Sequence, residues 1–434
     1  MVDFPSRAAR LPFDPTQSNC TAFHMSITDF STVTGREFSA DEIVPGGGRT
    51  GIWIGRAWVP AALAKNGVAG PRIVTLRDGL VIDASACFHT ISDALSAPEP
   101  VKAVREAGAT GASLGTLETV LKHGLFTRRA ARLTEETHVV LMAPNDIQPI
   151  KACGVTFVRS LLERVVEEKA KGDKAKALQI RKLIFETLGD DLSKTKPGSP
   201  ATVLLKERLI AEGLWSQYLE VGIGKDAEVF TKSQPSSAVT HGMQIGVLPD
   251  STWNNPEPEV VLAVSPVGKI VGATLGNDVN LRDYEGRSAL LLGEAKDQNG
   301  SCALGAFIRL FDENFSLRDA EQCEVELTLE GADGYKVTGR NKMAEISRSP
   351  EALVAQVCSD HHQYPDGFLL FLGTMFAPTT DRDKPGEGFT HKLGDRVEIA
   401  TPHLGRLVNW VNHTDKIPRW EYGVGEFIRF LRKM

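Results

Sequence analysis

The most informative run of residues is Asn254-Asn255-Pro256-Glu257-Pro258-Glu259-Val260-Val261-Leu262-Ala263-Val264. Residues two apart along a β-strand point to the same side. A strand that begins at Glu257 therefore turns the carboxylates of Glu257 and Glu259 to one side. The five apolar residues 260–264 do not alternate with polar residues, and this pattern predicts a strand that is covered on both faces.

Two carboxylates held side by side at the mouth of a buried strand repel each other unless a positive charge lies between them. Ligands that offer only oxygen favour a hard cation, so we expect Mg²⁺ first, with Mn²⁺ or Ca²⁺ as other occupants of the site. The alternative is a solvated strand entrance with two ordinary surface glutamates. The two glutamates alone do not decide between these interpretations.

The residues that follow favour the metal site. Apolar residues 271–273 predict a second short strand, and the acidic, amide-rich run 276–287 comes directly after it. Asp278 in this run offers a third carboxylate. Further on, Lys296 lies among small and polar residues. A lysine near a metal and several carboxylates serves as a proton carrier or a substrate clamp, whereas its alternative is a surface lysine in a loop.

The composition is that of a soluble globular protein. The chain has 434 residues, of which 42% are hydrophobic and 24% charged, which is enough for two or three domains. Its net charge of −6 gives no reason to expect nucleic acid or an anionic membrane as a partner. We find no membrane span and no secretory signal. Six scattered cysteines without CxxC pairing suit reduced thiols, so we expect a cytoplasmic enzyme.

The first half of the chain changes character at two points. Residues 1–47 are irregular and are expected to form an N-terminal extension. Residues 48–112 contain runs that alternate in strand fashion, and Arg77-Asp78-Gly79 has the composition of a hairpin turn. This segment predicts a small N-terminal β domain.

The rest of the chain divides into a helical and a strand-rich part. Residues 113–219 predict a helical segment, clearest over 156–188, where apolar residues recur at helical spacing. Residues 220–434 are rich in short strands and turns, including a predicted hairpin over 396–409, and are expected to form the catalytic domain. The fold class predicted is therefore α+β and β-rich.

Several phrases of this strand-rich part resemble the fumarylacetoacetate hydrolase superfamily. The likeness covers roughly residue 141 to the C-terminus and is carried by residues 215–221, 227–232, 253–264, 276–292, 301–305, 373–378 and 388–392. A Glu-x-Glu pair followed by Asn-Asp and later by a lysine is specific to this superfamily. The longer phrases resemble its bacterial 2-keto-3-deoxy-D-xylonate (2-keto-3-deoxypentonate) dehydratases. The resemblance implies a mixed β-sheet/roll catalytic domain and a homodimer or homotetramer.

The resemblance also implies roles for single residues. The metal ligands of the superfamily fall on Glu257, Glu259 and Asp278, the same acids that the strand pattern selects, and its lysine near the metal falls on Lys296. A glutamate that acts as acid or base in the related dehydratases falls on Glu228. The resemblance does not say which of Glu228 and Lys296 is the base and which is the acid.

Substrate-binding residues are implied in the same way. The arginine that follows the aspartate falls on Arg282, for which pairing with a neighbouring aspartate is the alternative. The glycine-threonine that helps to bind a substrate carboxylate falls on Gly373 and Thr374. Together with Arg282 and Thr374, Ser236 and Ser237 are candidates for holding the carboxylate and the hydroxyl groups of the substrate.

One departure from the superfamily bears on the reaction. Members that hydrolyse carbon–carbon bonds carry a histidine acid/base in the segment that corresponds to residues 222–228, and this segment contains no histidine. Activating water near neutral pH suits histidine, whereas a glutamate beside Mg²⁺ suits proton transfer on a substrate carbon. The nearest histidine, His241, is expected to be structural. His391 either belongs to a loop that closes over the site or caps that loop.

The resemblance therefore implies a Mg²⁺-dependent dehydratase, a lyase of pentose catabolism. It would convert a 2-keto-3-deoxy sugar acid such as 2-keto-3-deoxy-D-xylonate to 2-oxoglutarate semialdehyde. The steps are proton abstraction at carbon 3, a metal-stabilised enolate and loss of the carbon 4 hydroxyl. One alternative is an acylpyruvate or diketo acid hydrolase that uses the same metal. Another is a non-catalytic sugar-acid binding protein, which predicts the loss of a metal ligand.

Overall fold

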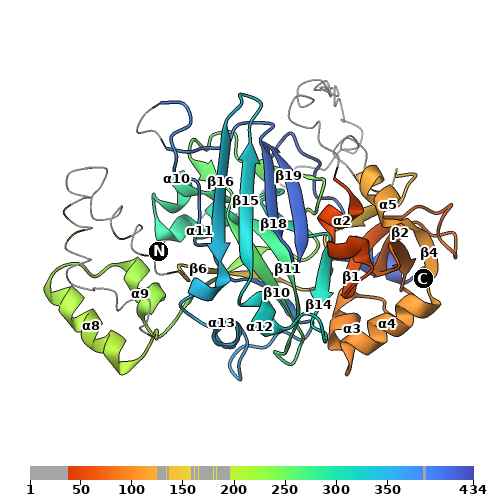
Figure 1. Ribbon diagram of the computed structural model, residues 1–434, viewed down its shortest axis with the longest axis horizontal. Coiled ribbons are helices and arrows are strands. Elements are labelled where there is room, and N and C mark those ends of the chain that lie inside the picture. The colour runs from red at the N-terminus through yellow and green to blue at the C-terminus, as the bar shows by residue number, and fades with distance from the viewer. Residues whose placement is uncertain are drawn as a thin grey trace, which may run out of the picture.

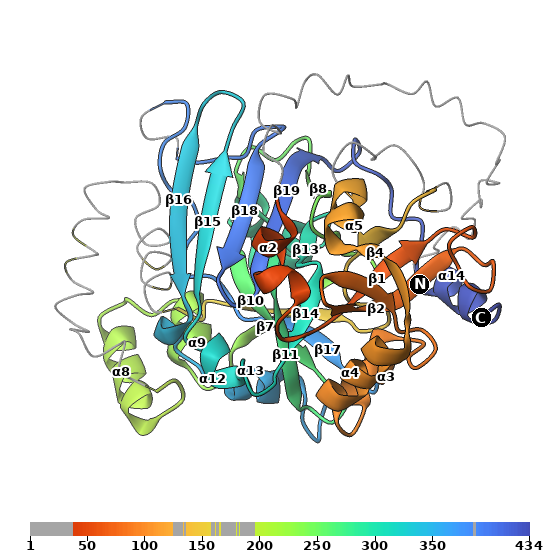
Figure 2. The ribbon, with the colours of Figure 1, turned by 45° about the vertical axis from the view of Figure 1, so that its right-hand side comes forward.

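The computed structural model describes residues 38–124, 136–157, 196–384 and 388–434, together with single positions 133, 161, 165, 179 and 182. Within these residues the fold is built on two β-sheets that pack face to face (Figures 1 and 2). The larger sheet follows the order β4 (Ala112–Thr116), β3 (Leu80–Asp83), β2 (Gly70–Arg77), β1 (Ile52–Val59), β14 (Phe307–Leu310), β11 (Ile270–Asp278), β10 (Pro258–Val264), β17 (Phe368–Phe371), β6 (Ile150–Gly154) and β7 (Glu228–Ser233).

Further strands complete the two layers. On the larger sheet, β13 (Cys302–Leu304) pairs with β11 and β5 (Val140–Met142) pairs with β1. The smaller sheet follows the order β16 (Lys336–Lys342), β15 (Glu324–Glu330), β18 (Arg396–Thr401), β19 (Gly405–His413) and β8 (Gln244–Val247). A separate two-stranded pair joins β12 (Asn280–Leu281) to β9 (Asn254–Asn255).

Short helices lie around the sheets. In chain order the α-helices are α2 (Ala40–Ile43), α3 (Ile91–Ser96), α4 (Pro100–Thr110), α5 (Leu117–Gly124), α8 (Pro200–Ala211), α9 (Gln217–Ile223), α10 (Arg282–Glu285), α11 (Leu292–Lys296), α12 (Leu317–Ala320), α13 (Pro350–Val357) and α14 (Val424–Leu431). The 3₁₀ turns are η2 (Pro45–Gly48), η6 (Ala289–Leu291) and η7 (Met343–Glu345). None of the described helices is both long and apolar enough to cross a membrane.

The prediction that residues 260–264 are covered on both faces is confirmed. Every residue of β10 is buried, and this strand pairs with β11 on one side and β17 on the other. Val260, Leu262 and Val264 pack against the smaller sheet. Val261 and Ala263 face the opposite way, into a core shared with α3 and α4. Because both faces are apolar, the strand needs no polar residue between its entrance and its end.

The strands of residues 48–112 continue the larger sheet. β1 pairs with β14, which in turn pairs with β11. The hairpin predicted at Arg77-Asp78-Gly79 joins β2 to β3, with Asp78 and Gly79 both at positive φ as a two-residue turn of this kind requires. The boundaries expected at residues 47, 112 and 219 stay predictions.

The segment 113–219 contains strands as well as helices. Its described helices are α5, α8 and α9, and α8 begins after Ser199, whose side chain accepts a hydrogen bond from the Thr202 amide. The helices expected over 156–188 fall almost wholly outside the described residues. The strands β5 and β6 in this segment were not predicted, because short buried strands lack the alternation that distinguishes a strand from a helix.

Other predicted elements are confirmed. The hairpin expected over 396–409 is formed by β18 and β19, and β15 alternates buried and exposed residues as its sequence suggests. The strand expected over 271–273 is longer than predicted, because β11 runs on to Asp278. Asp278 is therefore the last residue of this strand. The fold class is α+β and strand-rich, as expected.

Gly276 on β11 provides a test of this packing. It lies opposite Glu259, and a Cβ at this position would overlap the Phe371 ring and the Val261 side chain. Gly276→Ala is expected to lower the free energy of unfolding by about 1–3 kcal/mol through overpacking, measured by urea unfolding. Gly425→Ala on α14 is the control, because its Cβ would approach only the end of Arg429, at 3.8 Å. Equal stability of the two variants would contradict the described packing.

Candidate metal centre

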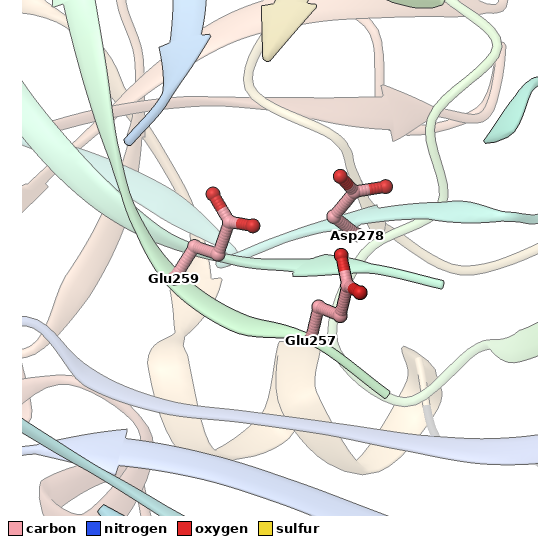
Figure 3. A group of neighbouring side chains, drawn as sticks. All are labelled: Glu257, Glu259 and Asp278. Carbon is pink, nitrogen blue, oxygen red and sulfur yellow. The ribbon is translucent and has the colours of Figure 1, made fainter. Parts of the chain in front are cut away.

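Three carboxylates meet where β10 and β11 pair. Glu257 directly precedes β10, Glu259 is its second residue, and Asp278 ends β11. The Asp278 amide donates to the Glu257 carbonyl at 3.0 Å, which places these residues opposite each other. One oxygen from each carboxylate lies within 4.8 Å of the others, and all three residues are buried. Figure 3 shows that the carboxylates gather on one side of the two strands.

Lys296 lies against this acidic triad (Glu257, Glu259 and Asp278). It is the last residue of α11, and its Nζ is 2.6 Å from Glu257 Oε2 and 3.1 Å from Asp278 Oδ2. Burial lowers the pKa of Lys296, but the charges of Asp278 and Glu257 outweigh this effect and raise the pKa above its ordinary value. The side chain of Lys296 is therefore an ammonium group at neutral pH in the metal-free protein.

Glu259 is almost fully buried, as is Asp278. Its Oε2 accepts a hydrogen bond of 2.6 Å from the amide of Gly373, which has a φ of +90°. Burial and the negative charges of Asp278 and Glu257 raise its pKa well above the ordinary value. Burial is the largest cause of this shift, and the two neighbouring carboxylates add to it.

The sequence analysis missed three residues that hold the triad. Asn277 accepts a hydrogen bond of 3.0 Å from the Glu257 amide, and Asn280 donates to Glu257 Oε1 at 3.0 Å. Lys232 on β7 lies 2.8 Å from Asp278 Oδ1. The asparagines belong to an amide-rich run, and Lys232 interrupts an apolar strand pattern. These are the only signals in the sequence, and neither specifies a partner.

Glu228 lies on the strand that carries Lys232. It is the first residue of β7 and pairs with Gly154. Phe230, two residues on, shares its side of the strand, and the Phe230 ring centroid is 5.5 Å from Lys296 Nζ. Glu228 and Glu259 both raise the pKa of the buried Cys153 thiol, after burial itself. Glu228 and Glu259 thus both lie near Cys153, and the catalytic role of Glu228 stays a prediction.

The predicted substrate-binding residues are differently placed. Arg282 is buried, with its guanidinium carbon 4.7 Å from the Trp253 ring centroid. Thr374 follows the glycine that binds Glu259, and its hydroxyl donates to the Phe376 carbonyl at 2.9 Å. The Ser236 hydroxyl donates to the Asp146 carbonyl at 2.7 Å, and that of Ser237 to the Gln234 carbonyl at 2.7 Å. Their roles in substrate binding stay predictions.

The two histidines are both buried. His241 Nδ1 accepts a hydrogen bond from the Val408 amide at 3.3 Å, and burial lowers its pKa to about 3. It is therefore neutral and joined to the core, as a structural histidine would be. His391 Nδ1 lies 3.4 Å from Asp395, which also binds Arg382 through both oxygens. The His391 amide donates to the Asn254 carbonyl at 3.3 Å, and this bond ties its loop to β9 beside the site.

The donor set fits a hard divalent cation. Three buried carboxylates offer oxygen ligands only, and they lie close enough to share one ion. Two lysine side chains compensate part of the three negative charges. The compensation by these two lysines is incomplete, because the three carboxylates outnumber them. A cation held by Glu257, Glu259 and Asp278 would complete it.

Comparisons with known proteins agree with this geometry. Residues 220–412 match the family model described as fumarylacetoacetate (FAA) hydrolase C-terminal. A curated relative from Saccharolobus solfataricus, 2-dehydro-3-deoxy-D-arabinonate dehydratase, is 27% identical over 60% of this chain and 88% of its own length. The probable 2-keto-3-deoxyxylonate dehydratase of Haloferax volcanii is 32% identical over 45% of this chain and 63% of its own length.

Solved structures share the fold. A 2-keto-3-deoxy-D-arabinonate dehydratase complexed with magnesium and 2,5-dioxopentanoate superposes with a TM-score of 0.55 at 20% identity, over 83% of this chain and 99% of that one. The apo form of a 2-keto-3-deoxy-D-arabinonate dehydratase gives a TM-score of 0.52 over the same shares, also at 20% identity. Residues 220–412 are thus a fumarylacetoacetate hydrolase domain, and the resemblance predicted from the sequence is confirmed.

Proposed function

We propose that this protein is a Mg²⁺-dependent hydro-lyase that removes water from a 2-keto-3-deoxy sugar acid such as 2-keto-3-deoxy-D-xylonate. The observation that carries the proposal is the buried triad of Glu257, Glu259 and Asp278 with Lys296 against it. All three acids and the lysine are in place. A non-catalytic binding protein on this fold would be expected to have lost one of them.

The relatives support the type of reaction. Both curated relatives carry dehydratase names, and both names describe 2-keto-3-deoxy five-carbon sugar acids. The solved dehydratase with the same fold holds magnesium and 2,5-dioxopentanoate, which is another name for 2-oxoglutarate semialdehyde. The names differ in the sugar acid, arabinonate or xylonate, so they support the class of substrate.

A divalent cation bound by the triad would polarise the keto group of the substrate and stabilise the negative charge that develops when the carbon 3 proton leaves. The protein's own residues supply the proton transfers. Glu228 is proposed as the base, because the Lys296 ammonium group already donates hydrogen bonds to Glu257 and Asp278. Lys296 in turn can donate a proton to the departing carbon 4 hydroxyl.

The rest of the site would orient the substrate. Thr374 lies next to the Gly373 amide that binds Glu259, so a carboxylate bound near the Thr374 hydroxyl would be beside the triad. Arg282, Ser236 and Ser237 are proposed to contribute to binding of the carboxylate and hydroxyl groups. The segment 222–228 offers no histidine for activating water, which favours dehydration over hydrolysis of a carbon–carbon bond.

The reaction itself is tested with purified protein, Mg²⁺ and 2-keto-3-deoxy-D-xylonate. We expect a product lighter than the substrate by one water, detected by mass spectrometry, and no product after EDTA treatment until Mg²⁺ is restored. Diketo acids, assayed in parallel, are expected to remain intact. Cleavage of a diketo acid into two smaller acids, with no dehydration of the sugar acid, would overturn the proposal in favour of the hydrolase.

Loss of one ligand tests the metal centre. Glu257→Gln is expected to lower kcat/KM by at least about 100-fold, because it replaces a charged ligand, which also pairs with Lys296, by a neutral amide. Glu324→Gln is the matched control, since Glu324 is partly exposed at the start of β15 and pairs with Arg340. Unchanged turnover of the Glu257 variant would show that the triad is not the active metal site.

The role of Glu228 is tested separately from metal binding. Glu228→Gln is expected to lower kcat by about 10²–10⁴-fold, the usual contribution of a general base, with Mg²⁺ affinity unchanged in calorimetry. Asp226→Asn, two residues earlier and exposed, is expected to keep full activity. A loss of Mg²⁺ affinity equal to the loss of activity would mean that Glu228 acts on the cation and not on the substrate.

The raised pKa of Glu259 predicts a pH effect on stability. In the metal-free protein the folded state keeps a proton on Glu259 that the unfolded chain releases near the ordinary pKa of about 4.3. Above that value the folded state binds more protons, so its free energy of unfolding falls as pH rises. The gain in Tm caused by saturating Mg²⁺ should therefore increase from about pH 5 to about pH 8.

Scanning calorimetry with and without Mg²⁺ measures this gain. His241, whose pKa is about 3, titrates in both forms and cancels in the difference. Glu259→Gln is expected to flatten the pH dependence because it removes the titrating group. A Mg²⁺ effect that is the same at every pH would contradict the electrostatic account of Glu259.

A further inference from the structure

Lys232 is a second buried lysine at the acidic triad. The proton transfers proposed above assign it no role. Its side chain is fully buried on β7. Its Nζ is 2.8 Å from Asp278 Oδ1 and donates to the carbonyls of Val279, at 3.0 Å, and Lys296. The two carbonyls accept hydrogen bonds from the ammonium group, and the Asp278 carboxylate pairs with its charge.

The two lysines divide the oxygens of Asp278 between them. Lys232 contacts Oδ1 and Lys296 contacts Oδ2. Lys232 is the deeper of the two, because its side chain is 0% exposed and that of Lys296 is 5% exposed. Lys232 therefore acts as a fixed positive charge behind the metal ligand, whereas Lys296 lies on the side of Glu257.

The charge of the site depends on this lysine. When all three carboxylates are ionised, as they would be around a bound cation, the triad and the two ammonium groups carry one net negative charge. A divalent cation and a 2-keto acid with one negative charge would then make the site neutral. Without Lys232 the loaded site would carry a net negative charge in a buried place, which disfavours an anionic substrate and favours the cation.

We propose that Lys232 is a positioning residue that sets the charge of the metal centre, weakening the hold on the divalent cation so that an anionic keto acid can bind beside it. The predicted effect of Lys232 on keto-acid binding rests on the proposed function, whereas its predicted effect on cation binding does not. Lys232 also donates a hydrogen bond to the carbonyl of Lys296. The same carbonyl accepts a second hydrogen bond from Ser301 Oγ at 2.8 Å.

The test measures two affinities that should shift in opposite directions. Lys232→Met removes the charge at similar length. Mn²⁺ binding, followed by electron paramagnetic resonance without any keto acid, is expected to tighten by at least about tenfold. Pyruvate binding to the Mn²⁺-loaded protein, followed by water proton relaxation, is expected to weaken by at least about tenfold. A keto acid without a carbon 4 hydroxyl reports binding alone.

Two further variants separate charge from structure. Lys232→Gln removes the same charge but keeps an amide that can donate to the carbonyls of Val279 and Lys296, so it should show the same pair of shifts even if the Met variant does not fold. Ser301→Ala removes one bond to the Lys296 carbonyl and leaves the charge, so both affinities should stay within about threefold of wild type.

Lys151→Met is the matched control. Lys151 lies on β6, next to β7, and its Nζ donates to Thr231 Oγ1 at 2.9 Å. It is a lysine beside Lys232 in the sheet that has no contact with the triad, and its loss should leave both affinities unchanged.

Each outcome decides between named explanations. Weaker binding of both Mn²⁺ and pyruvate by the Lys232 variants would mean that Lys232 only maintains structure, and unchanged Mn²⁺ binding would mean that its charge does not act on the cation. Either result overturns the proposal. If the wild-type protein binds Mn²⁺ but not pyruvate, the proposed function is wrong. The Mn²⁺ affinities of the variants then still test whether the charge of Lys232 weakens cation binding.

Discussion

Three carboxylates buried within 4.8 Å of one another repel, and the surrounding residues are arranged around this repulsion. The sheet brings the acids together, and each acid is then held by hydrogen-bond donors or by positively charged side chains. Glu257 accepts from Asn280 and Lys296, Glu259 from the Gly373 amide, and Asp278 lies between two lysines. Removing one partner would leave a buried charge uncompensated, which costs several kcal/mol.

The register between β10 and β11 fixes the positions of these acids. Register places Glu259 opposite Gly276, and the amide of Asp278 bonds to the carbonyl of Glu257. A slip of one residue would turn both glutamates to the other face of the sheet. The apolar residues of β10 prevent such a slip, since they fill cores on both sides. The same residues that make the strand buried therefore fix the position of its acids.

The sequence predicted the acids better than their surroundings. Two glutamates at the entrance of an apolar strand are a local pattern, and so is an aspartate after the next strand. The residues that hold them come from distant parts of the chain. Lys232 is 46 positions before Asp278 and Gly373 is 114 after Glu259, and no local pattern reports such pairings. The strand continuing from residue 273 to Asp278 was missed for a related reason, since its polar end is stabilised by partners and not by its own apolar residues.

The continuity between β1 and β14 has a consequence for any shortened form of the protein. β1 covers one side of β14, and the same strand also pairs with β2 and β5. A fragment that starts after β4 would lack β1, and the backbone N–H and C=O groups of β14 that face β1 would lose their partners. Exposed strand edges of this type recruit other strands and promote aggregation. The N-terminal strands therefore cover what would otherwise be an exposed edge of the sheet that carries the metal centre.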